Sequence, residues 1–171
     1  MTKMRTQQKG FTLLEVLIAM VVLSIGLLGV AGMQANSLRN NHNAFIKTQA
    51  SNLAADLADR MRANKSVKDN YVFDTDDGVT AAPTCISTGC TPAQMATYDI
   101  AMWSDQFTRD EKPILPDGRG VTSINGNTVT INILWTDLQY GTGQTIDDPN
   151  ANCPDTIKAA NTACFSMSFN L

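Results

Sequence analysis

The sequence lacks most of the groups from which active sites are built. It has a single histidine, His42, and its acidic residues are too scattered to suggest a general acid and base pair. It contains no nucleophile-elbow, phosphate-binding or dinucleotide-binding motif. We therefore expect a protein that is not an enzyme and that needs no cofactor.

Clusters of positive charge are also scarce. The chain holds 13 Lys and Arg against 16 Asp and Glu, and without the first ten residues, which carry three basic side chains and no acid, the balance is 10 against 16. Binding to nucleic acid depends on clustered basic side chains that neutralise phosphates. We expect no direct binding of nucleic acid.

Proline is absent from residues 11 to 64, and charge is absent from Val16 to Met33. As a helix, this uncharged stretch would span roughly 27 Å, close to the ~30 Å hydrocarbon core of a bilayer. The apolar part of a secretory signal is shorter, at about 7–15 residues. The pattern predicts a transmembrane helix over residues 11–33.

The helical pattern continues in amphipathic form over residues 34–64. Apolar residues recur there at steps of three and four, with charged and amide residues between them. We predict one helix of about 54 residues, of which residues 34–64 pack on a globular head formed by residues 65–171. The predicted apolar face consists of Leu38, Phe45, Ile46, Ala50, Leu53, Ala54, Leu57 and Met61.

The residues around the start of the apolar stretch need a functional explanation. The segment before it carries Lys3, Arg5 and Lys9, which favours a cytoplasmic N-terminus and an exported head. Glu15 lies near the beginning of the membrane segment, where a charge is costly unless it stays hydrated at the interface. If the chain were cut after Gly10, the new amine of Phe11 would lie one turn from this carboxylate.

The segment Gly10-Phe11-Thr12-Leu13-Leu14-Glu15 resembles the class III signal of type IV pilins and type II secretion pseudopilins. The resemblance implies that a prepilin peptidase cuts between Gly10 and Phe11, so that residues 1–10 are a cleaved leader. It also implies N-methylation of Phe11 and a role for Glu15 in filament assembly. The implied location is the bacterial inner membrane, with a periplasmic head, and later the pilus on the cell surface.

Two further segments, Leu23–Gln34 and Ala54–Asn64, are similar to minor pilins of the PilV type, the type IV pilus modification proteins. This resemblance implies a subunit that helps to prime pilus assembly and enters the filament near its tip. The implied partners are other minor pilins, the major pilin, the inner-membrane assembly machinery and a large tip adhesin. Adhesion and twitching motility would then be properties of the whole pilus. A type II secretion minor pseudopilin and a single-pass membrane protein that never polymerises remain open as alternatives.

The head is predicted to be α+β. Residues 64–92 are expected to be a loop, and Thr91 and Gln94 form a capping box for a helix that ends at about Arg109. Its expected apolar face consists of Met95, Tyr98, Met102, Trp103 and Phe107. An Asn125-Gly126 turn between two β-rich runs predicts a hairpin, and Phe165, Met167 and Phe169 alternate with serines in a last strand.

We predict a pilin-like fold with an antiparallel sheet of three or four strands on the long helix. Within it, Val129, Ile131, Ile133 and Trp135 should face that helix.

Four cysteines, Cys85, Cys90, Cys153 and Cys164, fit an exported domain with disulfide-closed loops. Proximity favours the pairs Cys85–Cys90 and Cys153–Cys164, although sequence alone leaves three connectivities. We expect no metal at these residues because no C-x-x-C pair occurs. A calcium loop at Asp74-Thr75-Asp76-Asp77-Gly78 is less well supported than a solvated turn, since the glycine and glutamate of an EF-hand are missing.

Overall fold

The computed structural model describes residues 10–85, 89–108, 114–136 and 162–171. The chain divides into two units, one up to Ala44 and one from Phe45 onward. Helix α1, Leu13–Ala63, contributes to both. The expected long helix is therefore confirmed within two residues at its start and one at its end. The absence of proline from residues 11–64 allows the backbone hydrogen bonds of the helix to continue over this length.

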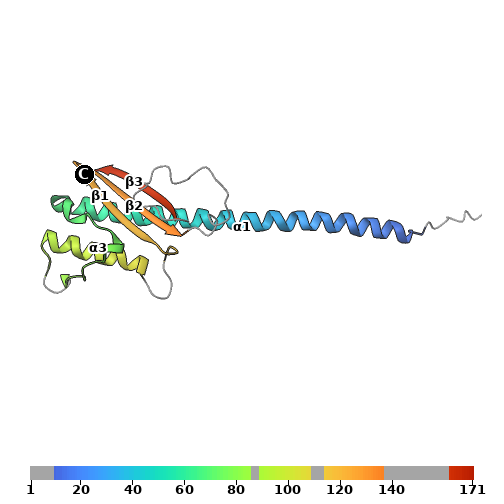
Figure 1. Ribbon diagram of the computed structural model, residues 1–171, viewed down its shortest axis with the longest axis horizontal. Coiled ribbons are helices and arrows are strands. Elements are labelled where there is room, and N and C mark those ends of the chain that lie inside the picture. The colour runs from blue at the N-terminus through green and yellow to red at the C-terminus, as the bar shows by residue number, and fades with distance from the viewer. Residues whose placement is uncertain (1–9, 86–88, 109–113, 137–161) are drawn as a thin grey trace, which may run out of the picture. The chain divides into compact units, whose positions relative to one another are not determined.

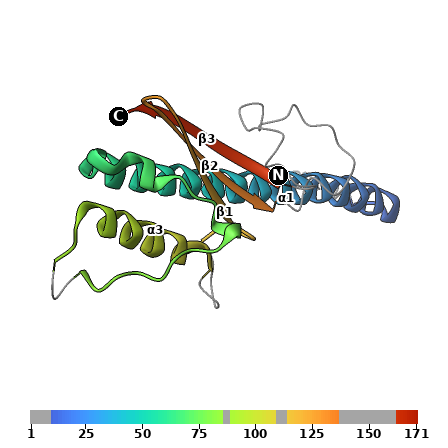
Figure 2. The same cartoon turned by 60° about the vertical axis from the view of Figure 1, so that its left-hand side comes forward.

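The other elements all belong to the second unit, which is the head. They are the 3₁₀ helices η1 (Lys65–Tyr71) and η2 (Thr75–Asp77), helix α3 (Pro92–Thr108), and strands β1 (Arg119–Asn125), β2 (Thr128–Thr136) and β3 (Thr162–Asn170). The strands form one antiparallel sheet in the order β1-β2-β3. Figures 1 and 2 show α3 beside the C-terminal part of α1, with the strands running obliquely across that part of the helix. This arrangement confirms the pilin-like α+β fold.

One face of the C-terminal part of α1 packs into the hydrophobic core of the head. Its buried residues are Ile46, Ala50, Leu53, Ala54, Leu57, Ala58 and Met61. For two residues, our prediction that they belong to this buried face is wrong. Leu38 is 70% exposed and precedes the head, and Phe45 is 58% exposed because it lies about 100° around the helix from Ile46.

The hairpin is present, but its turn lies one residue later than predicted. Asn125 pairs with Thr128, so the two turn residues are Gly126 and Asn127. Gly126 has φ +62°, whereas Asn127 is not among the described non-glycine residues with positive φ. This is the type II′ pattern, with glycine at the first central position, and its twist matches that of the flanking strands. The Asn-Gly pair was correctly placed in the hairpin but in the wrong register.

One face of the central strand β2 packs into the hydrophobic core, as predicted. Val129, Ile131, Ile133 and Trp135 are all buried in the same cluster as the α1 face. The other face of β2 is only partly solvated, since Asn132 and Leu134 are buried too. Leu134 packs with Cys164 and Val121 in a second, smaller cluster.

Helix α3 starts as predicted, and two residues of its predicted apolar face, Trp103 and Phe107, are buried in the core. The Gln94 N–H donates to Thr91 Oγ1 at 3.3 Å and the Thr91 N–H donates to Gln94 Oε1 at 3.0 Å, which is a capping box. Met102 is exposed, and Met95 and Tyr98 are only half-buried, so these three were wrongly assigned. The buried face consists of Ala96, Asp99, Ile100, Trp103, Ser104 and Phe107. The expected end at Arg109 lies outside the described residues.

The segment from Asn64 to Pro92 is more ordered than the expected loop. Besides the two 3₁₀ helices, it covers one edge of the sheet through a β-bridge between Asp74 and Val121. The Thr122 N–H donates to Phe73 O at 2.9 Å, and the Gly120 N–H donates to Thr75 Oγ1 at 3.0 Å. The edge of β1 is therefore closed by this chain itself.

Candidate functional site: the N-terminal segment and its surroundings

The beginning of α1 places the predicted processing and assembly residues on one exposed segment. Thr12 precedes the helix and caps it, because the Glu15 N–H donates to Thr12 Oγ1 at 3.3 Å and to Thr12 O at 3.1 Å. Glu15 is therefore in the first turn, where the helix dipole favours a negative charge. Our sequence reasoning missed this structural role, which the Thr-x-x-Glu spacing could have indicated.

The residues on either side of the predicted cleavage point are accessible. Phe11 is 83% exposed, and a Cβ built on Gly10 would meet no atom within 4 Å. Gly10 has no positive φ that would demand glycine. Within the described residues, neither packing nor backbone conformation requires glycine at this position.

The apolar part of α1 has no covering partner within the described chain. It contains an 18-residue window of mean hydropathy 2.6 of which 0% is buried, so it is long and apolar enough to cross a membrane. Built Cβ atoms on Gly26, Gly29 and Gly32 would also meet nothing within 4 Å. Large apolar side chains are exposed throughout, including Leu14, Leu23 and Leu28. Such a surface is stable only in lipid or against other apolar helices.

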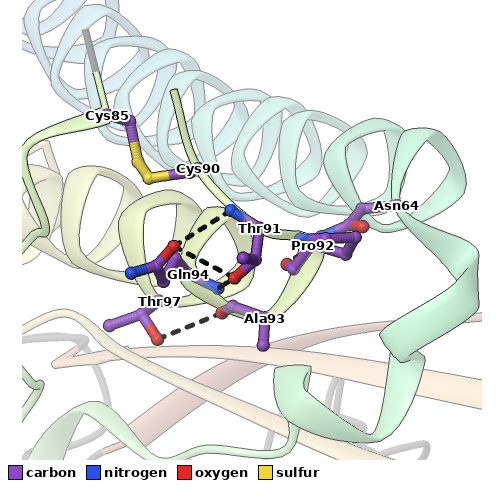
Figure 3. The surroundings of a disulfide bond; sticks show 8 residues. All are labelled: Asn64, Cys85, Cys90, Thr91, Pro92, Ala93, Gln94 and Thr97. Carbon is purple, nitrogen blue, oxygen red and sulfur yellow. Dashed lines mark hydrogen bonds between the residues drawn. A yellow bond between two sulfur atoms is a disulfide. The ribbon is translucent and has the colours of Figure 1, made fainter. Parts of the chain in front are cut away.

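The described cysteines lie in the head. Cys85 and Cys90 form a disulfide with a Cα–Cα distance of 5.1 Å, which is the pairing that proximity favoured. Figure 3 shows this bond beside the start of α3, next to the capping box of Thr91 and Gln94. Cys164 is also disulfide-bonded, while its expected partner Cys153 lies outside the described residues.

A partly buried polar network joins α1, η1 and α3. The Tyr71 hydroxyl donates to Asp99 Oδ2 at 2.7 Å, and Arg60 Nη1 donates to Asp99 Oδ1 at 3.2 Å. Arg60 also pairs with Asp56, and Asn64 Nδ2 donates both to the Tyr71 hydroxyl and to Pro92 O. Burial, together with the hydrogen bond to Asp99, raises the pKa of Tyr71, so this phenol stays neutral and acts as a donor. The network is a means of docking the three elements onto one another.

The acidic side chains near Asp74 are paired with the guanidinium of Arg119. Arg119 Nε donates to Asp74 Oδ1 at 2.9 Å, Nη2 donates to Asp74 Oδ2, and Asp76 forms an ion pair with Nε at 3.1 Å. The Arg119 guanidinium lowers the pKa of Asp74. The expectation of a solvated turn is wrong for Asp74, whose side chain is only 16% exposed. Within the part of the chain that the structure describes, no three His, Cys, Asp or Glu residues gather as metal ligands would.

Comparison with protein families gives two adjoining matches. Residues 5–31 match the prokaryotic N-terminal methylation motif, and residues 32–101 match the Tt1218-like family, described as type IV pilin Tt1218. The first match contains the exposed Gly10–Glu15 segment, and the second contains the part of α1 that carries the head core. The chain is a type IV pilin-like protein. Comparison with curated proteins and with solved structures gives no match.

The pilin-like protein thus combines a methylation motif, an apolar N-terminal helix and a head held together by its own core. The motif implies processing by a prepilin peptidase. Pilins are in general structural proteins without enzymatic activity. An apolar N-terminal helix with this motif is consistent with a pilin of the inner membrane that later enters a pilus.

Proposed function

We propose that the protein is a minor pilin of the PilV type, a structural subunit that takes part in priming type IV pili and enters the filament near its tip. The observation that carries the proposal is the contrast between the two parts of α1. The part in the head is buried on one face, whereas the apolar part after Glu15 is exposed on every side. A surface of that kind fits lipid first and neighbouring subunits afterwards.

The proposed assembly step depends on charge. Removal of residues 1–10 gives Phe11 a free amine, which is methylated and keeps its positive charge. The carboxylate of Glu15 on one subunit then attracts the amine of a neighbour in apolar surroundings. Two unit charges 4 Å apart interact by about 4 kcal/mol at an effective dielectric constant of 20, before the cost of desolvation. This attraction would fix the register between adjacent stems.

The similarity of Leu23–Gln34 and Ala54–Asn64 to PilV-type minor pilins supports the subtype. On this proposal the partners are other minor pilins, the major pilin, the inner-membrane assembly machinery and a large tip adhesin. Gly26, Gly29 and Gly32 have open space around them, which would let neighbouring helices approach closely.

Processing is tested by mass spectrometry of the native protein. We expect a mature chain that begins at Phe11 and carries one added methyl group. Gly10→Ala should reduce cleavage only modestly, because alanine is nearly as small, whereas a bulky residue at position 10 should block it. A native, functional protein that still begins at Met1 would contradict the proposal.

The role of Glu15 is tested in cells. Glu15→Val should insert in the membrane and be cleaved, but its amount in sheared pili should fall by roughly tenfold or more, because the ion pair is lost. Glu15→Asp keeps the charge and serves as the control, with a smaller loss. Equal amounts of wild type and Glu15→Val in pili would contradict the charge-pair role.

Priming is tested by deleting the gene and restoring it. We expect fewer pili per cell in the deletion strain and normal numbers after complementation. Normal pili with a defect in protein secretion would instead identify a type II secretion pseudopilin.

A further inference from the structure

The two edges of the head sheet differ in how they are closed. At β1 the chain pairs its own residues 73–75 with the edge, through the bridge of Asp74 to Val121 and the bond from the Thr122 N–H to Phe73 O. Among the described residues, no comparable segment pairs with residues 165–170 of β3. β3 is the last strand in the sheet order, and Figures 1 and 2 show it at the margin of the sheet.

The register shows which main-chain groups of β3 point outward. The Leu171 N–H donates to Asn127 O at 3.0 Å, so this opposed pair is hydrogen-bonded. In an antiparallel ladder, hydrogen-bonded pairs alternate with non-hydrogen-bonded ones. The N–H and C=O groups of Ser166, Ser168 and Asn170 therefore point away from β2. The 3.0 Å contact between the Thr130 and Ser168 hydroxyls agrees, since side chains lie closer in non-hydrogen-bonded pairs.

These outward groups have no partner in the described chain. Within residues 10–85, 89–108, 114–136 and 162–171, no backbone hydrogen bond outside the β-ladder itself involves the main chain of Ser166, Ser168 or Asn170. Their alternate spacing along the strand matches the main chain of another extended strand. The edge therefore offers a row of donors and acceptors for strand addition.

The side chains of β3 specify what such a strand must look like. Phe165, Met167 and Phe169 pack against the core but stay only partly buried, so an added strand would cover their exposed parts. Ser166 and Ser168 lie on the opposite face. Residues 162–171 include no charged side chain and no proline, the devices that natural proteins use to block an edge.

We propose that the outer edge of β3, from Phe165 to Asn170, is a docking site for an extended strand of another protein. That strand has apolar residues at every second position, which cover Phe165, Met167 and Phe169, and uncharged polar residues between them. The proposal concerns the head alone and holds whether or not the chain proves to be a minor pilin.

The first test is amide hydrogen exchange of the full chain in detergent micelles, followed residue by residue by NMR. In the protein alone, the amides of Phe165, Met167 and Phe169 should exchange slowly and those of Ser166 and Ser168 rapidly. The probe is a synthetic peptide with the sequence of β2, residues 128–136, flanked by lysines for solubility. It should slow exchange at Ser166, Ser168 and Asn170, and a peptide of the same composition with its apolar residues grouped together should not.

The second test is a matched pair of variants. Ser168→Pro removes an N–H that points away from β2, so it leaves the β2–β3 ladder intact and removes a bond to the added strand. Ser168→Ala loses the same hydroxyl but keeps the N–H. We expect peptide binding to weaken by roughly tenfold in Ser168→Pro and to stay unchanged in Ser168→Ala.

Three results would overturn the proposal. The first is protection of the Ser166 and Ser168 amides in the dilute protein alone, which would mean that this chain covers its own edge. The second is protection that grows with protein concentration without peptide, which would make a second copy the occupant. The third is no protection by the alternating peptide in the wild type, a result that does not depend on the folding of any variant.

Discussion

At the scale of single residues, two glycines of the head are explained by close contact. A Cβ on Gly120 would lie 2.4 Å from Trp103 Cη2, and one on Gly118 would lie 2.6 Å from Phe107 Cδ1. Both rings are buried and stack edge to face with their centroids 4.8 Å apart. The start of β1 can approach α3 only because these positions lack a side chain.

Gly120→Ala should therefore destabilise the head. Because the Trp103 ring is enclosed, we expect a loss of about 1–3 kcal/mol in the free energy of unfolding, typical of overpacking. Ser123→Ala, at an exposed position on the same strand, is the control and should change little. Denaturant unfolding of the full chain in detergent measures both, and equal midpoints would show that the ring can move aside.

Asp74 gives the head a pH dependence whose sign is fixed by its partner. Hydrogen bonds from Arg119 hold the pKa of Asp74 below its ordinary value of 3.8. A carboxyl with a depressed pKa in the folded state adds stability above its unfolded pKa, and that stability is lost as pH falls through the folded pKa. Between about pH 5 and about pH 2, wild type should lose more stability than Asp74→Asn. Parallel pH–stability curves of the two proteins would contradict this origin.

At the scale of elements, the start of α3 depends on its capping box. Thr91→Ala removes the acceptor for the Gln94 N–H and should cost about 1 kcal/mol of stability. Thr97→Ala is the matched control, since Thr97 only donates to Ala93 O within the same helix (Figure 3). Thermal unfolding compares them. A Thr91→Ala protein as stable as Thr97→Ala would mean that the nearby disulfide or Pro92 suffices to start the helix.

Elements with a strong local pattern could be predicted, together with the buried face of β2, but the full buried face of α3 could not. Periodicity and caps located α1, α3 and the three strands. On α3 we chose the large apolar residues Met95, Tyr98 and Met102, whereas the structure buries Asp99. Asp99 can be buried because Arg60 and Tyr71 pair with it, and those residues lie 39 and 28 positions away in the chain. No local pattern contains such a pairing.

At the scale of the whole molecule, the fold of the head is confirmed, whereas the roles of the candidate site stay a prediction from one short sequence motif. Gly10, Phe11 and Glu15 lie within one segment of six residues, and the roles proposed for them would involve an enzyme and other subunits more than the fold of this chain. The partners in the head are distant in sequence. Arg119 was not expected to neutralise Asp74, and residues 73–75 were not expected to close the β1 edge. These contacts appear only when the chain is folded.

The C-terminal part of α1 also determines how the head would respond to force. The indole N–H of Trp103 donates to Leu53 O at 2.9 Å, and Arg60 on the same helix holds Asp99 on α3. A force along the axis of α1 would shear this helix against α3. The Trp103–Leu53 hydrogen bond and the Arg60–Asp99 ion pair would then bear the force at the same time. A head anchored in this way yields only when several hydrogen bonds break together.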